Sequence, residues 1–219
     1  MDSILNFLQE IFELFTNSMI NPEWILKHGG MYLIIFIIFA ETGLFIGFFL
    51  PGDALVFVTG IIIANASQPF ETGIANLVFW DSILILAAIL GNIVGYWFGK
   101  KSGPMLYKRK DSWIFKAKHL RQATEFYIKR GGTAIIVARF LPIIRTFAPI
   151  VAGIVKMEYK KFLRTNVIGA ILWILSFTSL GFLFGNNPII ADNLHYIVIG
   201  LIIITTGPVL FKMLQSKVK

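Results

Sequence analysis

Long apolar tracts alternate with short polar or basic segments along most of the chain, which is the pattern of a protein that crosses a membrane several times. Residues 78–99, 166–185 and 196–211 are each apolar over about the length that a helix needs to cross a hydrocarbon core of ~30 Å. We therefore predict transmembrane helices at these three ranges. The rest of the apolar sequence lies in two tracts of a different kind.

These two tracts do not suit a single membrane crossing. Residues 31–64 would form a helix of ~50 Å at ~1.5 Å per residue, much longer than the membrane core requires, and Pro51 interrupts them. Residues 133–155 contain Pro142 and Pro149. Proline removes a backbone donor and clashes with the preceding helical turn. We therefore predict that each tract bends near its prolines.

Both tracts also carry charges at positions where lipid would penalise them. Glu41 and Asp53 lie in the first tract, and Arg139 and Arg145 lie in the second. A charged side chain at the centre of a membrane helix costs at least ~2.5 kcal/mol on insertion scales. Irregular, charged segments persist at that depth only where protein or a water-filled cavity satisfies their polar groups. We interpret Arg139–Gly153 as half of a polar site buried in the membrane.

The composition supports this class of protein. The chain has 219 residues, of which 56% are hydrophobic and 15% are charged, whereas a soluble domain carries about 25% charged residues. We expect residues 1–219 to form one membrane domain. The absence of cysteine excludes disulfides and thiolate metal sites, and the three histidines share no ligand spacing. We expect no metal, no cofactor and no catalytic residues.

The distribution of basic residues predicts the topology. Residues 100–130 hold ten of the twenty lysines and arginines, and residues 156–164 are also basic. Basic loops mark the cytoplasmic side of a membrane, which we prefer to a nucleic-acid site. If both loops are cytoplasmic, residues 133–155 must enter and leave the membrane on the same side, as a re-entrant hairpin. By the same rule the basic carboxyl terminus is cytoplasmic.

The amino-terminal part lacks basic residues up to position 26. Within the predicted interfacial segment 1–30, residues 3–20 have apolar positions at helical spacing, which favours an amphipathic helix in the membrane interface. A helix packed on the edge of the bundle fits equally well. Residues 65–77 form a polar loop without basic residues and are expected outside. Residues 31–64 are then a second re-entrant hairpin, which enters from the opposite face.

The order of features repeats in the two halves of the chain. Each half has a proline-broken tract with two charges, followed by a span that ends in Gly-aromatic-x-Phe-Gly, at Gly95–Gly99 and at Gly181–Gly185. Inverted repeats with broken helices are typical of secondary transporters. We predict an all-α membrane protein: an inverted repeat of two opposed re-entrant helical hairpins plus transmembrane helices, with an amino-terminal amphipathic helix.

The charged motifs also resemble those of a known family. Glu41 is followed after nine residues by Pro51-Gly52-Asp53, and the second tract reads Arg139-Phe140-x-Pro142-x-x-Arg145-Thr146-x-x-Pro149-x-x-Ala152-Gly153. This combination resembles the DedA family of bacterial inner-membrane proteins, which share a domain with eukaryotic lipid scramblases of the endoplasmic reticulum. The resemblance covers about residues 20–211 of the chain.

The resemblance implies lipid transport. DedA-family proteins look like flippases or scramblases for undecaprenyl phosphate or phosphatidylethanolamine, and they are linked to the proton motive force and to envelope integrity. It also implies that Glu41, Asp53, Arg139 and Arg145 correspond to residues that the family requires. Both active flipping and passive scrambling fit the sequence, as does a homo-oligomer.

The chemistry of the residues suggests roles for them. Arginine pairs with phosphate in bidentate geometry and keeps its charge, so Arg139 and Arg145, with the hydroxyl of Thr146, are candidate ligands for a phosphate headgroup. The residues that we expect at the hairpin bends are Pro51, Gly52, Pro142, Pro149 and Gly153.

Glu41 and Asp53 can change charge, which arginine cannot. A deprotonated carboxylate would pair with an arginine, and a protonated one would free that arginine for phosphate, so we predict that protons are coupled to lipid movement through them. In the alternative, the four charges form salt bridges that only lock the hairpins together. Two other functions fit the sequence less well. A lipid phosphatase would need a nucleophilic histidine, and neither tract contains one. In a cation–proton antiporter, the two arginines would repel the transported cation.

Overall fold

The structure is a computed structural model that describes most of the two halves of the chain. Within the described part all regular structure is helical, which confirms the prediction of an all-α protein there. The predicted interfacial helix at 1–30, the basic sequence beyond Lys108 and the span at 196–211 lie almost wholly outside it. The structure describes residues 29–43, 52–65, 69–108, 133–140, 142–185, 187, 193, 196, 197 and 200.

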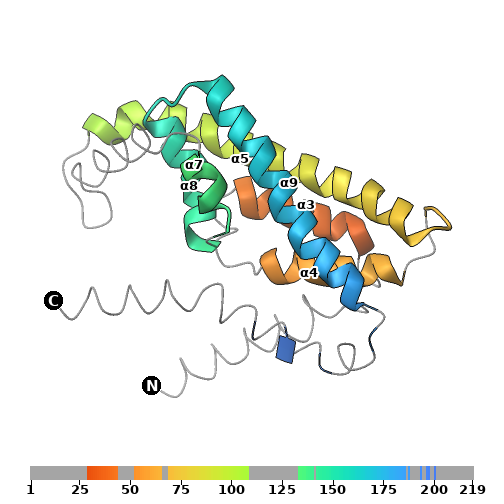
Figure 1. The fold of residues 1–219 in the computed structure, drawn as a ribbon. Coiled ribbons are helices and arrows are strands. Elements are labelled where there is room, and N and C mark those ends of the chain that lie inside the picture. The colour runs from red at the N-terminus through yellow and green to blue at the C-terminus, as the bar shows by residue number, and fades with distance from the viewer. Residues whose placement is uncertain are drawn as a thin grey trace, which may run out of the picture.

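Two long helices organise the described part, α5 (Gly73–Lys108) and α9 (Tyr159–Phe184). They are the two helices of this part that are long and apolar enough to cross a membrane. They run antiparallel: Tyr96 of α5 contacts Tyr159 at the start of α9, with ring centroids 5.6 Å apart. At the other end, Thr178 of α9 donates a hydrogen bond to Asp81 of α5. Figure 1 shows the two helices side by side.

Both long helices extend beyond the ranges predicted from hydropathy. Helix α5 exceeds 78–99 at both ends, so the last part of the expected loop 65–77 and the first part of the expected basic segment 100–130 are helical. Helix α9 starts at Tyr159, inside the expected loop 156–164. Lysine and arginine are good helix formers and extend their charged ends to the membrane surface. Their appearance therefore ends the apolar pattern without ending the helix.

Four short helices occupy the two broken tracts. The first tract holds α3 and α4, and the second holds α7 and α8. Helix α8 begins at proline, whose fixed φ suits the first turn and whose missing N–H is not needed there. The chain between α7 and α8 forms a turn that contains Arg139 and Phe140. The bounds of the four helices are Gly30–Gly43 (α3), Gly52–Ala64 (α4), Thr133–Ala138 (α7) and Pro142–Ile154 (α8).

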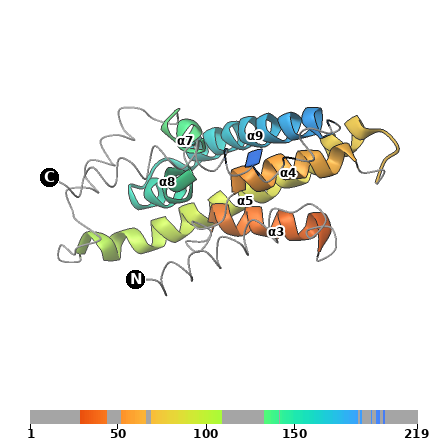
Figure 2. The same cartoon turned by 90° about the horizontal axis from the view of Figure 1, so that it is seen from below.

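The two halves exchange helices. Helix α4 packs along α9 of the other half, and α8 packs along α5, while α3 and α7 pack on the long helix of their own half. Figures 1 and 2 show α4 beside α9 in two views. If α3, α4 and α5 are matched with α7, α8 and α9, the contact between α4 and α9 corresponds to that between α8 and α5. The contact between α3 and α5 likewise corresponds to that between α7 and α9. The packing therefore has the same plan in both halves.

Glycines allow the two exchanged helices to approach closely. A Cβ atom added at Gly60 of α4 would overlap the carbonyl oxygen of Thr178 on α9. In the other half, a Cβ atom added at Gly153 of α8 would overlap the carbonyl oxygen of Tyr96 on α5. Small residues at helix crossings permit such backbone contact in membranes. Gly60 and Gly153 thus occupy matching places in the two halves.

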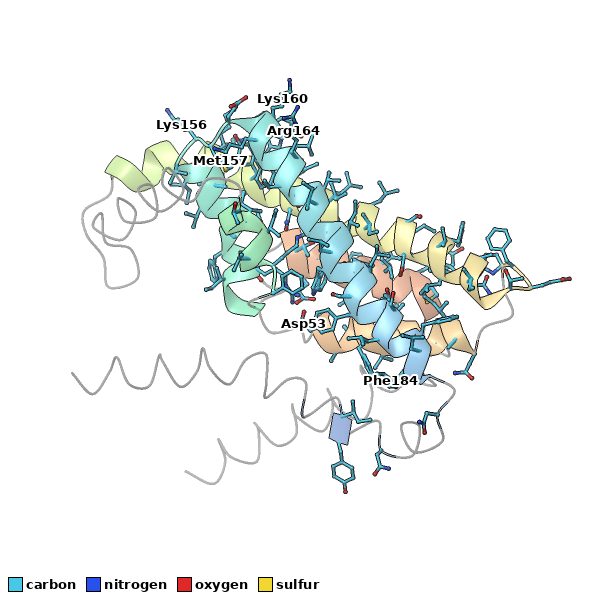
Figure 3. The ribbon with its side chains drawn as sticks, in the orientation of Figure 1. Asp53, Lys156, Met157, Lys160, Arg164 and Phe184 are labelled. Carbon is cyan, nitrogen blue, oxygen red and sulfur yellow. The ribbon has the colours of Figure 1, made fainter. Side chains whose placement is uncertain are left out.

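The long helices expose apolar residues on the face opposite the core. Leu90 of α5 and Leu183 of α9 are 53% and 73% exposed, while Leu84 and Ala170 are fully buried. A helix that is apolar all round suits a lipid environment. Figure 3 places Lys156, Lys160 and Arg164 at one end of α9 and Phe184 at the other, with Asp53 between them.

Candidate functional site

Glu41, Asp53 and Arg145 form one buried ion-pair cluster. Arg145 Nη1 donates to Asp53 Oδ1 at 2.6 Å, and Arg145 Nη2 donates to Glu41 Oε1. Glu41 comes from α3, Asp53 from α4 and Arg145 from α8, and each residue is at most 4% exposed. Gly52 lies against the Glu41 carboxylate, which a Cβ atom at that position would overlap. The structure thus brings three of the four predicted charges together.

The cluster lies where three helices end. Glu41 is in the last turn of α3, and Asp53 and Arg145 are in the first turns of α4 and α8. Helix dipoles favour an acid at an amino end and a cation at a carboxyl end. Asp53 agrees with its helix dipole, whereas Glu41 and Arg145 oppose theirs. Their mutual pairing offsets these unfavourable positions, so these helix ends stabilise one another only when the two broken tracts meet.

Trp173 of α9 lies at the centre of the charged residues. Its ring is fully buried, and its Nε1 donates to Asp53 Oδ1 at 2.8 Å. The guanidinium carbon Cζ of Arg145 is 4.5 Å from the Trp173 ring centroid, and that of Arg139 is 6.0 Å away. Both distances are in the range of cation–π contact. The sequence prediction did not include Trp173, although a tryptophan in mid-span, away from the interfacial belts, needs a partner for its N–H.

Arg139 occupies a separate, neutral environment. Its Nη2 donates to Asn166 Oδ1 at 2.7 Å and to the carbonyl oxygen of Ala88 at 3.3 Å. Asn92 adjoins the same nitrogen: with its amide oxygen turned to Arg139, it accepts at 2.6 Å and donates to the carbonyl of Thr42 at 3.1 Å. The prediction missed Asn92 and Asn166. Their signal was a pair of amides inside apolar spans, where polar side chains bond between helices.

The site lies at the middle of the two long helices. Trp173 is 14 residues after the first residue of α9 and 11 before the last, which places it ~21 Å and ~17 Å from the two ends at ~1.5 Å per residue. Asn92 is 19 residues from the start of α5 and 16 from its end, or ~28 Å and ~24 Å by the same rise. The charged residues are therefore buried near the middle of the length of the two long helices.

The other predicted site residues have varied positions. Thr146 is buried on α8, and its hydroxyl has no hydrogen-bond partner in the described structure. Pro142 begins α8, as a bend residue would, whereas Pro149 lies inside α8 and does not end it. Gly153 serves the close contact of α8 with α5 rather than a bend. Pro51 lies outside the described residues.

A further buried carboxylate lies apart from this cluster. Asp81 of α5 is 2% exposed and accepts a hydrogen bond from Thr178 Oγ1 at 3.0 Å, while its Oδ1 has no hydrogen-bond partner. We did not select Asp81 or Thr178 from the sequence, because Asp81 lies near the start of a predicted span. The described residues contain no group of three or more His, Cys, Asp or Glu side chains that could hold a metal ion.

Comparisons with known proteins identify the family of the chain. Residues 50–183 match the model of the VTT domain. The protein DedA of Escherichia coli K12 is 42% identical over 197 residues, which cover 89% of this chain and 88% of DedA. The chain belongs to the DedA family of membrane proteins.

Other relatives carry similarly general names. An uncharacterized membrane protein of Mycobacterium tuberculosis H37Rv is 34% identical over 177 residues, with coverage of 81% of this chain and 75% of the relative. The inner membrane protein YqjA of E. coli K12 is 29% identical over 192 residues, covering 86% and 82%. No solved structure matches the chain. The matched VTT region contains every residue of the site except Glu41 and Thr42.

Proposed function

We propose that this protein is a lipid transporter, a flippase or scramblase, which moves a phosphate-bearing lipid such as undecaprenyl phosphate or phosphatidylethanolamine across the bacterial inner membrane. One observation carries the proposal: two arginines and two carboxylates are buried at the middle of two antiparallel apolar helices. Fixed charges at this depth are expensive and mark substrate or ion pathways. Guanidinium groups suit phosphate, and a lipid tail can stay in the bilayer while its headgroup crosses.

We further propose that the two broken tracts are re-entrant hairpins of an inverted repeat. In support, α4 starts at the central cluster and ends beside Gly185, at the far end of α9. Helix α8 starts at the same cluster and ends beside Gly103, at the opposite end of the bundle. Each broken helix would thus reach the membrane centre from a different face, as in transporters with alternating access.

The proposed orientation follows the basic residues. In the described structure, every lysine and arginine outside the central site belongs to the carboxyl end of α5 or to the start of α9 and the turn before it. This end is cytoplasmic by the positive-inside rule, and so is the carboxyl terminus. The name of one relative, the inner membrane protein YqjA, supports placement in the inner membrane, where we propose that the protein contributes to envelope integrity.

Protons would be linked to transport through the ion-pair cluster. Arg145 is paired with both Glu41 and Asp53 through Nη1 and Nη2, so its charge is compensated, and its Nε has no hydrogen-bond partner among the described residues. Protonation of one carboxylate would leave the two arginines with a single counter-charge between them, so that an arginine, with the unpartnered hydroxyl of Thr146, could hold phosphate. A phosphatase is less well supported, since neither broken tract contains a histidine that could serve as its nucleophile.

Reconstitution in liposomes tests the proposal. The purified chain is expected to move fluorescent phosphatidylethanolamine or undecaprenyl phosphate between leaflets, faster with a pH gradient than without one. Glu41→Gln and Asp53→Asn are expected to remove the gradient dependence, because an amide cannot carry the proton. Glu71→Gln is the matched control, since Glu71 is exposed in a loop. Lipid movement equal to that of empty liposomes would refute transport, and unchanged gradient dependence in both variants would refute the coupling.

A further inference from the structure

Arg139 is a buried cation without an acidic partner among the described residues. Its side chain is 1% exposed, and both described ion pairs of this region belong to Arg145. The partners of Arg139 are amide and carbonyl oxygens, all on Nη2. The effective cost of burying an ion is several kcal/mol unless an opposite charge or sufficient hydrogen bonds compensate it. The two arginines of the site are therefore not equivalent.

The N–H groups of Arg139 that have no hydrogen-bond partner can also be identified. Nε and Nη1 have no hydrogen-bond partner in the described structure, so three of the five N–H donors of the guanidinium remain unused. Meanwhile Asn92 and Asn166 hold Nη2, and each is itself fixed to a backbone carbonyl, that of Thr42 and that of Ile89. One nitrogen is anchored by neutral groups, and the remaining donors are left for an acceptor that the chain does not supply there.

The charges of the whole site indicate when such an acceptor is needed. Glu41, Asp53 and Arg145 together carry one net negative charge when both acids are ionised, and this balances Arg139, whose guanidinium lies near the same Trp173 ring as that of Arg145. When one carboxylate takes up a proton, this cluster becomes neutral and Arg139 has no counter-charge. A phosphate oxyanion that enters with the proton would restore neutrality.

We propose that Arg139 is the residue that binds the phosphate group of the lipid headgroup, and that Asn92 and Asn166 are positioning residues that hold its guanidinium through Nη2. This rests on the proposed function in lipid transport and assigns phosphate binding to one arginine. Arg145 instead belongs to the proton-carrying cluster. Arg139 is buried in this structure, so phosphate reaches it only after the surrounding helices separate.

The decisive variant is Asn166→Asp. It places a carboxylate of the same shape 2.7 Å from Arg139 Nη2, so the arginine acquires an internal counter-ion that competes with phosphate. The second variant is Arg139→Gln, which removes an uncompensated buried charge and is expected to leave the melting temperature unchanged or raised. Arg164→Gln is the control, because Arg164 is an exposed arginine of the same bundle.

The measurement is calorimetric titration of the full chain in phosphate-free maltoside micelles with short-chain phosphatidic acid and, separately, with inorganic phosphate. Asn166→Asp and Arg139→Gln are each expected to weaken binding at least tenfold, which is a loss of about 1.4 kcal/mol or more, while Arg164→Gln binds normally. Glu41→Gln, which imitates the protonated acid, is expected to tighten binding severalfold.

The outcomes separate this site from the transport function. Normal phosphatidic acid binding by folded Asn166→Asp overturns the assignment to Arg139, even if lipid still moves in liposomes. Arg139-dependent binding without lipid movement supports the site and refutes transport. Binding of inorganic phosphate alone overturns the assignment to a lipid headgroup. If Arg139→Gln fails to fold, Asn166→Asp decides the matter, since it preserves the arginine and its neighbours.

Discussion

Replacing Trp173 with phenylalanine tests whether one indole ring joins the carboxylates to the arginines. In the structure the ring is fully buried, donates to Asp53 Oδ1 at 2.8 Å, and lies 4.5 Å from the guanidinium carbon of Arg145. Phenylalanine retains an aromatic face for the cation but has no N–H. The substitution therefore removes the hydrogen bond and part of the ring while it leaves all four charged residues in place.

The expected loss of stability is the sum of two contributions. A hydrogen bond to a charged group contributes about 1.5–3 kcal/mol to stability. The missing part of the indole leaves unfilled space in a rigid interior, and cavities of this kind cost about 1–2 kcal/mol through lost contacts. The free energy of unfolding should therefore fall by about 2.5–5 kcal/mol, a large part of the stability of an ordinary domain of about 5–15 kcal/mol.

The assay is unfolding of the purified full chain in detergent micelles, with Trp97→Phe as the matched control. Trp97 is half exposed on α5 and does not contact the charged cluster. The ammonium group of Lys100 lies over its ring, 4.7 Å from the centroid. Its replacement should change the unfolding free energy by no more than about 0.5 kcal/mol. If the Trp173 variant unfolds at the same point as the Trp97 variant, the indole does not hold the cluster together, and the proposed role of the Asp53 hydrogen bond is wrong.

Two further substitutions test the packing of the bundle. Gly60→Ala should destabilise the protein by about 1–3 kcal/mol through overpacking, because the added Cβ would overlap the Thr178 carbonyl. The control is Gly73→Ala, whose Cβ meets only the ring of Phe182 and should cost little. Equal melting curves for the two variants would contradict the close contact at Gly60. Thr178→Val should cost about 1–3 kcal/mol, because it removes the hydroxyl that donates to the buried Asp81 carboxylate. The double variant Asp81→Leu with Thr178→Val should recover most of this loss of stability. Failure to recover it would mean that Asp81 has another role.

The charged residues could be found from the sequence because a charge inside an apolar tract carries a large free-energy cost in lipid. A glutamate or an arginine inside an apolar tract is expensive in lipid wherever it points, so Glu41, Asp53, Arg139 and Arg145 were evident without a structure. Their pairing was not. Both carboxylates contact Arg145, at sequence separations of 104 and 92 residues, and only the packing of three helix ends decides that choice.

The neutral residues of the site carried a weaker signal. Asn92, Asn166 and Trp173 are tolerated in a membrane helix for many reasons, and their importance depends on which helix faces them. The ends of the long helices were also underestimated, since Lys100, Lys101 and Lys160 interrupt the apolar pattern while remaining good helix formers. Hydropathy reports where lipid contact ends, whereas a helix ends where its backbone hydrogen bonds do.

The exchange of helices between the two halves has a consequence for synthesis of the protein. Asp53 emerges from the ribosome 92 residues before Arg145 and 120 before Trp173. At roughly 5–20 residues per second, the first half waits about 5–20 s in or beside the membrane with its acids unpaired and α4 without the helix that it packs against. An insertion factor that shelters polar segments would act in this interval, and a protease that removes unassembled membrane proteins would have its best access then.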